Sequence, residues 1–87
     1  MDTIYKALAD KQRRKILELL RASDMTVTEI AVHFDISGAS LSHHLAVLKQ
    51  ARLVVAEREG QCIRYSLNTS VMEEIMKSVL SVLGKGK

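Results

Sequence analysis

Two adjacent histidines stand among three serines near the middle of the 87-residue chain, in the stretch ISGASLSHHL that begins at Ile36. Hydroxyls and imidazoles in such a cluster serve nucleophilic catalysis, metal binding or hydrogen bonding to a polar partner such as nucleic acid. Ser40 and His44 are one helical turn apart, but no acid nearby would orient the imidazole and no glycine-rich loop would form an oxyanion hole. The stretch therefore does not predict an enzyme.

Metal binding fits the same residues poorly. A closed metal site needs about four ligands. His43 and His44 are neighbours that point apart on a helix, and His33 belongs to a different predicted helix. Cys62 is the single cysteine and lies in a predicted strand, where we interpret it as a small strand residue. The cluster is then either a plain polar helix surface or a surface that hydrogen-bonds a partner.

The composition predicts one folded domain over residues 1–87, because 47% hydrophobic and 26% charged residues are ordinary globular values. Aromatic residues make up only 3%, so we expect an aliphatic, mainly helical core. No apolar run approaches the ~20 residues that span a bilayer, and no signal-peptide pattern opens the sequence. A lone cysteine also agrees with a reducing compartment. We therefore expect a cytoplasmic protein without membrane insertion, whose net charge of +3 is compatible with nucleic-acid binding.

Apolar residues at helical spacing predict five helices. Two lie within residues 4–20, a short one within 26–34, one runs from about Gly38 to about Ala51, and the last covers 71–83. We expect the N-caps to be Asp10, Thr26 or Thr28, and Ser37. Arg14 is expected to bond a carboxylate of a neighbouring segment and so hold helices together. The sequence from Gly84 onward is a tail with no predicted core partner.

Residues 53–67 change to the alternation typical of strands. Two runs, 53–58 and 61–67, are joined at Glu59-Gly60 and predict a hairpin whose inner face carries Ile63, Tyr65 and Leu67. Two short helices separated by a turn, followed by a charged hairpin, describe a winged helix-turn-helix. The predicted fold is therefore mainly α with a β-hairpin wing (α+β), in the order ααααββα.

The fourth predicted helix has two different faces. Three leucines form its inner stripe, so small and polar residues occupy or flank the opposite face. These residues are Ala39, Ser40, Ser42, His43 and Ala46. Serine hydroxyls and an imidazole can bond phosphates or base edges, and small side chains allow close approach, so this face fits a DNA groove. His44 lies beside the leucines, where we expect a structural hydrogen bond to a neighbouring carbonyl.

Three segments, ALADKQRRKILELL, MTVTEIAVHFDISGASLSHHLAVLKQARLV and EREGQCIRYSL, resemble in this order the ArsR/SmtB family of bacterial winged-helix repressors. The ending YSLNTSV is most similar to the SdpR-type autorepressors of that family. The resemblance covers nearly the whole chain. It implies a homodimeric, autoregulatory transcriptional repressor whose fourth helix enters the major groove of an inverted-repeat operator. It leaves open whether a protein partner or the repressor's own concentration relieves repression.

The resemblance also implies which residues contact DNA. They are Thr26 and Thr28 for phosphates, Ser37, Gly38, Ser40, Ser42 and His43 on the fourth helix, and Arg58, Gln61 and Arg64 on the wing.

The chain departs from the family pattern at four positions. Lys11 and Ala39 stand where the family commonly has proline, and Arg52 stands where glycine is usual. Gly38 replaces a longer polar side chain and cannot make its base contact. Arg52 offers an additional phosphate contact.

The last predicted helix is apolar over more of its circumference than packing on one small domain requires. This surplus indicates a second subunit, and the resemblance implies a homodimer formed by the first and last helices. The expected interface residues are Ile4, Tyr5, Leu8, Met72, Ile75, Met76, Val79, Leu80 and Leu83.

Many members of the resembled family sense metals, but this sequence lacks their ligands. The family's cysteine site would fall at Thr26 and Thr28, whose hydroxyls are poor ligands for soft ions. The last helix has no Asp or His, and Glu73 and Glu74 are adjacent. We therefore expect a DNA-binding repressor without a metal site or other cofactor.

Two alternatives remain. A winged helix can bind protein instead of DNA, although such a surface would expose apolar or acidic residues rather than Ser, His and small residues beside Arg58 and Arg64. Oxidation of Cys62 would be a second way to relieve repression.

Overall fold

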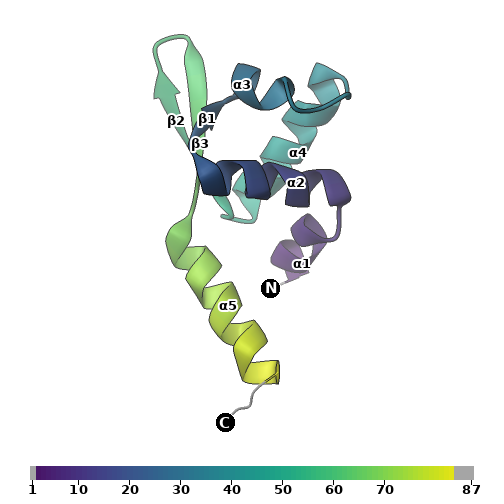
Figure 1. Cartoon of the computed structure of the whole chain (residues 1–87), viewed down its shortest axis with the longest axis vertical. Coiled ribbons are helices and arrows are strands. Elements are labelled where there is room, and N and C mark those ends of the chain that lie inside the picture. The colour runs from purple at the N-terminus through teal and green to yellow at the C-terminus, as the bar shows by residue number, and fades with distance from the viewer. Residues whose placement is uncertain (1, 84–87) are drawn as a thin grey trace.

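The computed structural model describes residues 2–83, so the predicted tail from Gly84 lies outside the described residues. Its elements are α1 (Asp2–Leu8), α2 (Lys11–Ala22), β1 (Met25–Thr26), α3 (Val27–Ala31), α4 (Gly38–Gln50), β2 (Val54–Glu59), β3 (Cys62–Leu67) and α5 (Thr69–Leu83). The three strands form one antiparallel sheet in the order β1-β3-β2. Helices α2, α3 and α4 gather beside this sheet, whereas α5 extends away from it (Figure 1). The predicted winged helix-turn-helix fold is confirmed.

One element was missing from the predicted order. The strand β1 pairs Met25 with Tyr65 and Thr26 with Arg64, which adds a third strand to the expected hairpin. A strand of two residues is too short to show alternation, and Thr26 falls within the range predicted for the third helix. The observed order is therefore ααβααββα.

The core lies between α2, α3, α4 and the sheet. Its fully buried large side chains are Ile16, Ile30, Leu45, Leu48 and Leu53. Tyr65 is buried on the inner face of β3 as predicted, but Ile63 on the same face is 40% exposed. Ile63 pairs with Arg58 near the tip of the hairpin, which projects beyond the helices (Figure 1). The predicted alternation of inner and outer residues along β3 is correct, but none of the described helices covers the inner face at the hairpin tip.

Predicted N-caps begin the helices α2 and α3. Asp10 Oδ1 accepts the backbone N–H groups of Gln12 at 2.7 Å and Arg13 at 3.2 Å, as expected for the N-cap of α2. Burial raises the pKa of the Asp10 carboxyl, but these two hydrogen bonds, together with nearby positive charge, outweigh it and leave the pKa lowered. Thr26, and not Thr28, caps α3. Its hydroxyl accepts from the backbone of Glu29, whose carboxylate accepts the Thr26 N–H in return.

The predicted partner of Arg14 is wrong. Its Nη1 donates to the carbonyl oxygen of Leu8 at 2.7 Å, and not to a carboxylate. Leu8 is the last residue of α1, and the carbonyls at a helix end have no partner inside the helix. Arg14 still holds α1 and α2 together, as expected, but it does so through the backbone.

The end of α4 explains why glycine would suit position 52. The N–H of Arg52 donates to the carbonyl of Lys49 and the N–H of Leu53 to that of Leu48, each at 3.0 Å, which is a Schellman ending. This ending requires a left-handed residue, and Arg52 has φ 65°. A residue with a Cβ pays about 1 kcal/mol or more for that conformation.

We expect Arg52→Gly to raise the free energy of unfolding by about 0.5–1 kcal/mol, after allowing for the greater freedom of glycine in the unfolded chain. Urea denaturation measures the change, and Lys49→Gly, inside the same helix, serves as the control that should lower stability by about 1 kcal/mol. Equal destabilisation by both substitutions would contradict this explanation of the α4 ending.

Candidate nucleic-acid interface

The helix α4 is anchored on one face and open on the other. Leu41, Leu45 and Leu48 are at most 2% exposed and pack into the core. The opposite face carries Ala39, Ser40, Ser42, His43 and Ala46, all of which are exposed. This arrangement brings together the polar face predicted from the sequence. Four of its five members lie in the first half of α4, where the helix follows the turn from α3.

The beginning of α4 is shaped by Ser37 and Gly38. Ser37 Oγ accepts the backbone N–H of Ser40 at 3.1 Å, so the predicted N-cap is present and Ser37 remains exposed. A Cβ added at Gly38 would meet no atom within 4 Å. The packing around this position therefore does not require glycine.

The two predicted phosphate-binding threonines have different surroundings. Thr26 is 9% exposed, and its hydroxyl caps α3. Thr28 is exposed on the first turn of α3. Of the two hydroxyls, that of Thr28 is the one open to a partner.

The wing holds its two arginines differently. Arg58 and Gln61 are exposed near the tip. Arg64 is half-buried: its Nε lies 3.1 Å from both carboxylate oxygens of Glu59, and its Nη2 lies 3.0 Å from Oε1. Its Nη1 also donates to the carbonyl of Asp24 at 3.3 Å. These contacts tie the wing to the segment that precedes α3.

A second carboxylate joins this network from α3. Glu29 lies 3.8 Å from Nη1 of Arg64. The backbone N–H of Thr26 lowers the pKa of the Glu29 carboxyl, and the Arg64 charge adds to this effect. Hydrogen bonding to Glu59 and its negative charge raise the pKa of Arg64. The charge of Arg64 is thus largely balanced within the protein, whereas Arg58 forms no salt bridge among residues 2–83.

The two histidines at the centre of the sequence cluster point to different surroundings. Their rings are 5.9 Å apart with planes inclined at 52°. His43 is exposed, as predicted, but the predicted carbonyl partner of His44 is wrong. Nδ1 of the half-buried His44 lies 3.2 Å from Nη1 of Arg13. Sequence reasoning missed this role of Arg13, because nothing in the spacing distinguishes it from the neighbouring basic residues.

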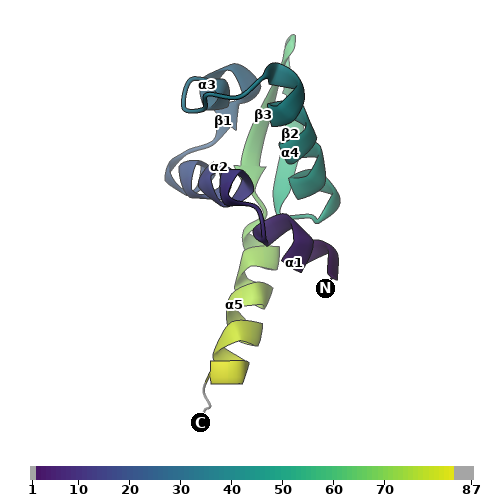
Figure 2. The same ribbon diagram turned by 90° about the vertical axis from the view of Figure 1, so that its right-hand side faces the viewer.

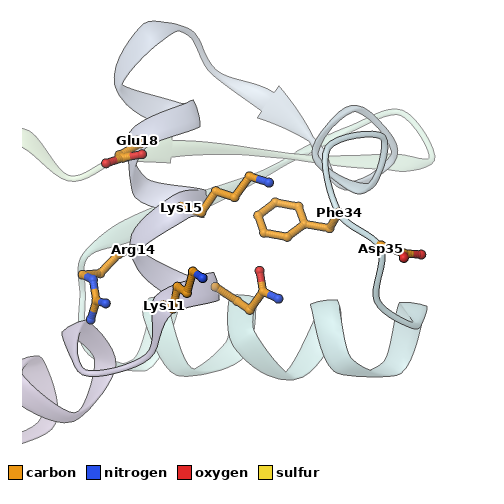
Figure 3. A pocket seen from close by; sticks show the side chains of 7 residues that line it. Lys11, Arg14, Lys15, Glu18, Phe34 and Asp35 are labelled. Atoms are coloured by element: carbon orange, nitrogen blue, oxygen red, sulfur yellow. The ribbon is translucent and has the colours of Figure 1, made fainter.

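A separate polar hollow of about 540 Å³ lies between α2 and the turn after α3. Figure 3 shows its lining residues, among them Lys11, Arg14 and Lys15 along one side of α2. Lys15 Nζ donates to the carbonyl of His33 at 3.0 Å and lies 4.9 Å from the centre of the Phe34 ring. Lys15 therefore contacts and stabilises the turn that leads into α4.

The first and last helices form an apolar surface. An apolar hollow of about 220 Å³ between α1 and α5 is lined by Ile4, Tyr5, Ile75, Ser78, Val79, Val82 and Leu83. None of the described residues of α5 is buried. Of the predicted interface residues, Ile4, Leu8, Met72 and Ile75 are half-buried, and Tyr5, Met76, Val79, Leu80 and Leu83 are exposed. Val82, 84% exposed, was not predicted, although the helical spacing from Ile75 and Val79 indicates it.

Side chains that could bind a metal are scattered over the described part of the chain. Within residues 2–83, no three His, Cys, Asp or Glu side chains are grouped so that they could hold a metal ion. Cys62 is exposed and is a free thiol in the structure. No helix in the same range is long and apolar enough to cross a membrane.

The family pattern described as "Bacterial regulatory protein, arsR family" matches residues 10–55, which include α2, the helix-turn-helix and the beginning of the wing. The chain belongs to this family. The ArsR-family resemblance inferred from the sequence is thereby confirmed. The matched residues include the whole of α4.

Two ArsR-family relatives cover most of the chain. The transcriptional repressor SdpR of Bacillus subtilis (strain 168) is 49% identical over 86 residues, which cover 99% of this chain and 96% of SdpR. The arsenical resistance operon repressor of Staphylococcus aureus is 32% identical over 79 residues, which cover 91% of this chain and 76% of that repressor. Both relatives are repressors by name.

Solved structures agree with the fold. A possible transcriptional regulator for arsenical resistance has a TM-score of 0.84 at 28% identity, covering 98% of this chain and 88% of that one. The homodimeric winged helix-turn-helix DNA-binding domain of Mb0332 from Mycobacterium bovis has a TM-score of 0.77 at 30% identity. The match covers 94% of this chain and 76% of that one.

Proposed function

We propose that this chain is a homodimeric, sequence-specific DNA-binding repressor that regulates its own transcription, and that it carries no metal-sensing site. The observation that carries the proposal is the exposed polar face of α4, set opposite three buried leucines and beside the exposed Arg58 of the wing. The repressor function of SdpR and the homodimeric DNA-binding domain of Mb0332 support it.

In this mechanism α4 enters the major groove. Ser40, Ser42 and His43 face base edges, where hydroxyl and imidazole groups can donate or accept hydrogen bonds. Thr28 and Arg58 contact phosphates on either side and fix the position of the helix on the duplex. A second copy, related by a twofold axis, presents the same helix about one helical turn (~34 Å) away, so the operator is an inverted repeat. Bound in this way, the dimer blocks access to the promoter.

The test is selection of duplexes from a random pool, followed by gel-shift titration of the selected duplex and of the DNA upstream of the chain's own coding region. We expect saturable binding to an inverted repeat at least about 10³-fold tighter than binding to random DNA. The same titration with an oxidant tests Cys62. A chain that enriches no sequence and binds all duplexes equally would refute the proposal and favour a protein-binding winged helix.

The wing provides a prediction about salt. Arg58→Ala should flatten the plot of log affinity against log salt by roughly one unit for each phosphate that Arg58 neutralises, because its charge has no salt-bridge partner among residues 2–83. Arg64→Ala should lower affinity for all duplexes with a smaller change in slope, because Glu59 and Glu29 already balance its charge. Lys77→Ala, on α5, is the control for removing one positive charge. Equal slopes for the Arg58 and Arg64 variants would contradict the assignment.

A second prediction concerns metals. Operator affinity should not change on addition of zinc or cadmium or of a chelator at neutral pH, because Thr26 and Thr28 supply no thiolate and α5 has no His or Asp. Titration of the dissociation constant against metal concentration measures this. A saturable change at a fixed ratio of metal to protein would show that the chain has a metal site after all.

A further inference from the structure

The end of α1 is fixed to α2 by the side chain of Arg13. Its Nε donates to the carbonyl of Ala7 at 2.9 Å, and its Nη2 donates to that of Lys6 at 2.9 Å. Both carbonyls belong to the last turn of α1, whose acceptors lack partners inside the helix, although the Lys6 carbonyl also accepts the N–H of Ala9 at 3.3 Å. One guanidinium thus satisfies two of these acceptors and uses two of its three nitrogens.

The third nitrogen reaches α4. Nη1 of Arg13 lies 3.2 Å from Nδ1 of His44. A guanidinium has only donors and keeps its charge, so Nδ1 must be the acceptor. An imidazole that accepts at Nδ1 carries its single proton on Nε2 and is neutral. The hydrogen bond therefore exists only while His44 is uncharged.

We propose that Arg13 and neutral His44 form a pH-sensitive link that holds α4 in its DNA-reading orientation relative to α1, so that protonation of His44 weakens operator binding. The inference rests on the proposed function. Helix α1 carries Ile4 and Tyr5 of the surface assigned to the second copy, and it lies against both α2 and α4 (Figure 2). The link therefore joins the helix that faces the partner to the helix that faces DNA. Arg13 and His44 are positioning residues, because neither belongs to the exposed face of α4.

The charges around His44 decide the direction of the effect. Protonated His44 would present a second cation at hydrogen-bond distance from Arg13, with no acceptor left to offer. The negative charge of Asp10, at the N-cap of α2, favours a charged His44 and therefore acts together with acid against the link. His43, whose ring centre lies 5.9 Å from that of His44, supplies no negative charge. Acid therefore breaks the link.

The opposite contributions of the two histidines make the link testable. Protonation of exposed His43 adds a positive charge that faces DNA and should strengthen binding, whereas protonation of His44 should weaken it. The dissociation constant of the selected duplex is measured at about pH 7.5 and about pH 5.5 for the wild-type chain and for His44→Asn, which keeps an acceptor near the position of Nδ1 but does not titrate. We expect acid to weaken wild-type binding roughly three- to tenfold more than binding by His44→Asn.

Arg13→Lys is the matched variant, because it keeps the charge but cannot bond two carbonyls and an imidazole at once. It should also lose the extra acid sensitivity, with unchanged circular dichroism at both pH values. Equal pH dependence of the wild type and both variants would overturn the link.

The ring proton of His44 can be observed without DNA. Nitrogen-15 spectra of the free protein at neutral pH should show His44 as the Nε2–H tautomer, and the Nδ1–H tautomer would overturn the link. If the chain selects no duplex, the proposed function fails, but this spectrum still decides whether Arg13 and neutral His44 are hydrogen-bonded.

Discussion

Replacing Ile75 and Val79 together with lysine is expected to make the protein monomeric and to weaken operator binding by roughly 10²- to 10⁴-fold, because two linked half-site contacts become one. Both side chains line the apolar hollow between α1 and α5, and Val79 is 48% exposed in the single chain. Burying two ammonium groups against a second copy would cost far more than leaving them in water. Sedimentation measures the monomer fraction, and gel-shift titration measures the affinity.

The control adds the same charge to the other side of α5. Glu74→Gln combined with Ser81→Lys also raises the net charge by two, but both positions lie on the polar side of the helix. It should remain dimeric and bind the operator at least as well as the wild-type chain. Because Ile75 also packs against the core, Val79→Lys with Leu83→Lys repeats the test at two exposed positions. A monomeric variant that binds the full operator as tightly as the wild type would contradict the dimer.

Ser42→Ala and His43→Ala are each expected to weaken operator binding by about 1–3 kcal/mol and binding to random DNA by much less, because a base-edge contact acts only on the correct sequence. Both side chains are exposed on the half of α4 that follows the helix-turn-helix turn. The measured quantity is the ratio of operator affinity to random-duplex affinity at one salt concentration.

Gln50→Ala is the control for these substitutions, since Gln50 is exposed at the opposite end of the same helix. It should leave the ratio unchanged. Equal losses on operator and random DNA for Ser42→Ala and His43→Ala would mean that these residues only position α4, and that sequence is read through DNA shape.

The sequence predicted the helices, the wing and the polar face of α4 because each depends on local chemistry. The caps Asp10 and Ser37 lie within three residues of the N–H groups that they bind, and the leucine stripe repeats at helical spacing. The strand β1 escaped prediction because two residues carry no periodicity, and its pairing with β3 crosses about 40 residues of sequence.

Long-range side-chain contacts were the part that could not be predicted. Arg13, Arg14 and Lys15 are consecutive cations, yet their side chains have different partners. Arg13 contacts His44, Arg14 donates to the carbonyl of Leu8, and Lys15 lies over the ring of Phe34. Which partner each side chain reaches depends on how α2 is rotated against α1 and α4. The contacts of Arg64 were equally unpredictable from the sequence. Arg64 pairs with Glu59 across the hairpin and with Glu29 on a helix far from it in sequence.

The central claim is that two copies of this chain read one inverted repeat through α4, and hydroxyl-radical footprinting of the selected duplex tests it most directly. We predict two equivalent protected patches on one side of the duplex, centred about one helical turn (~34 Å) apart, at a stoichiometry of two chains per duplex by sedimentation. A single protected patch with one chain bound, or uniform protection along the duplex, would contradict it.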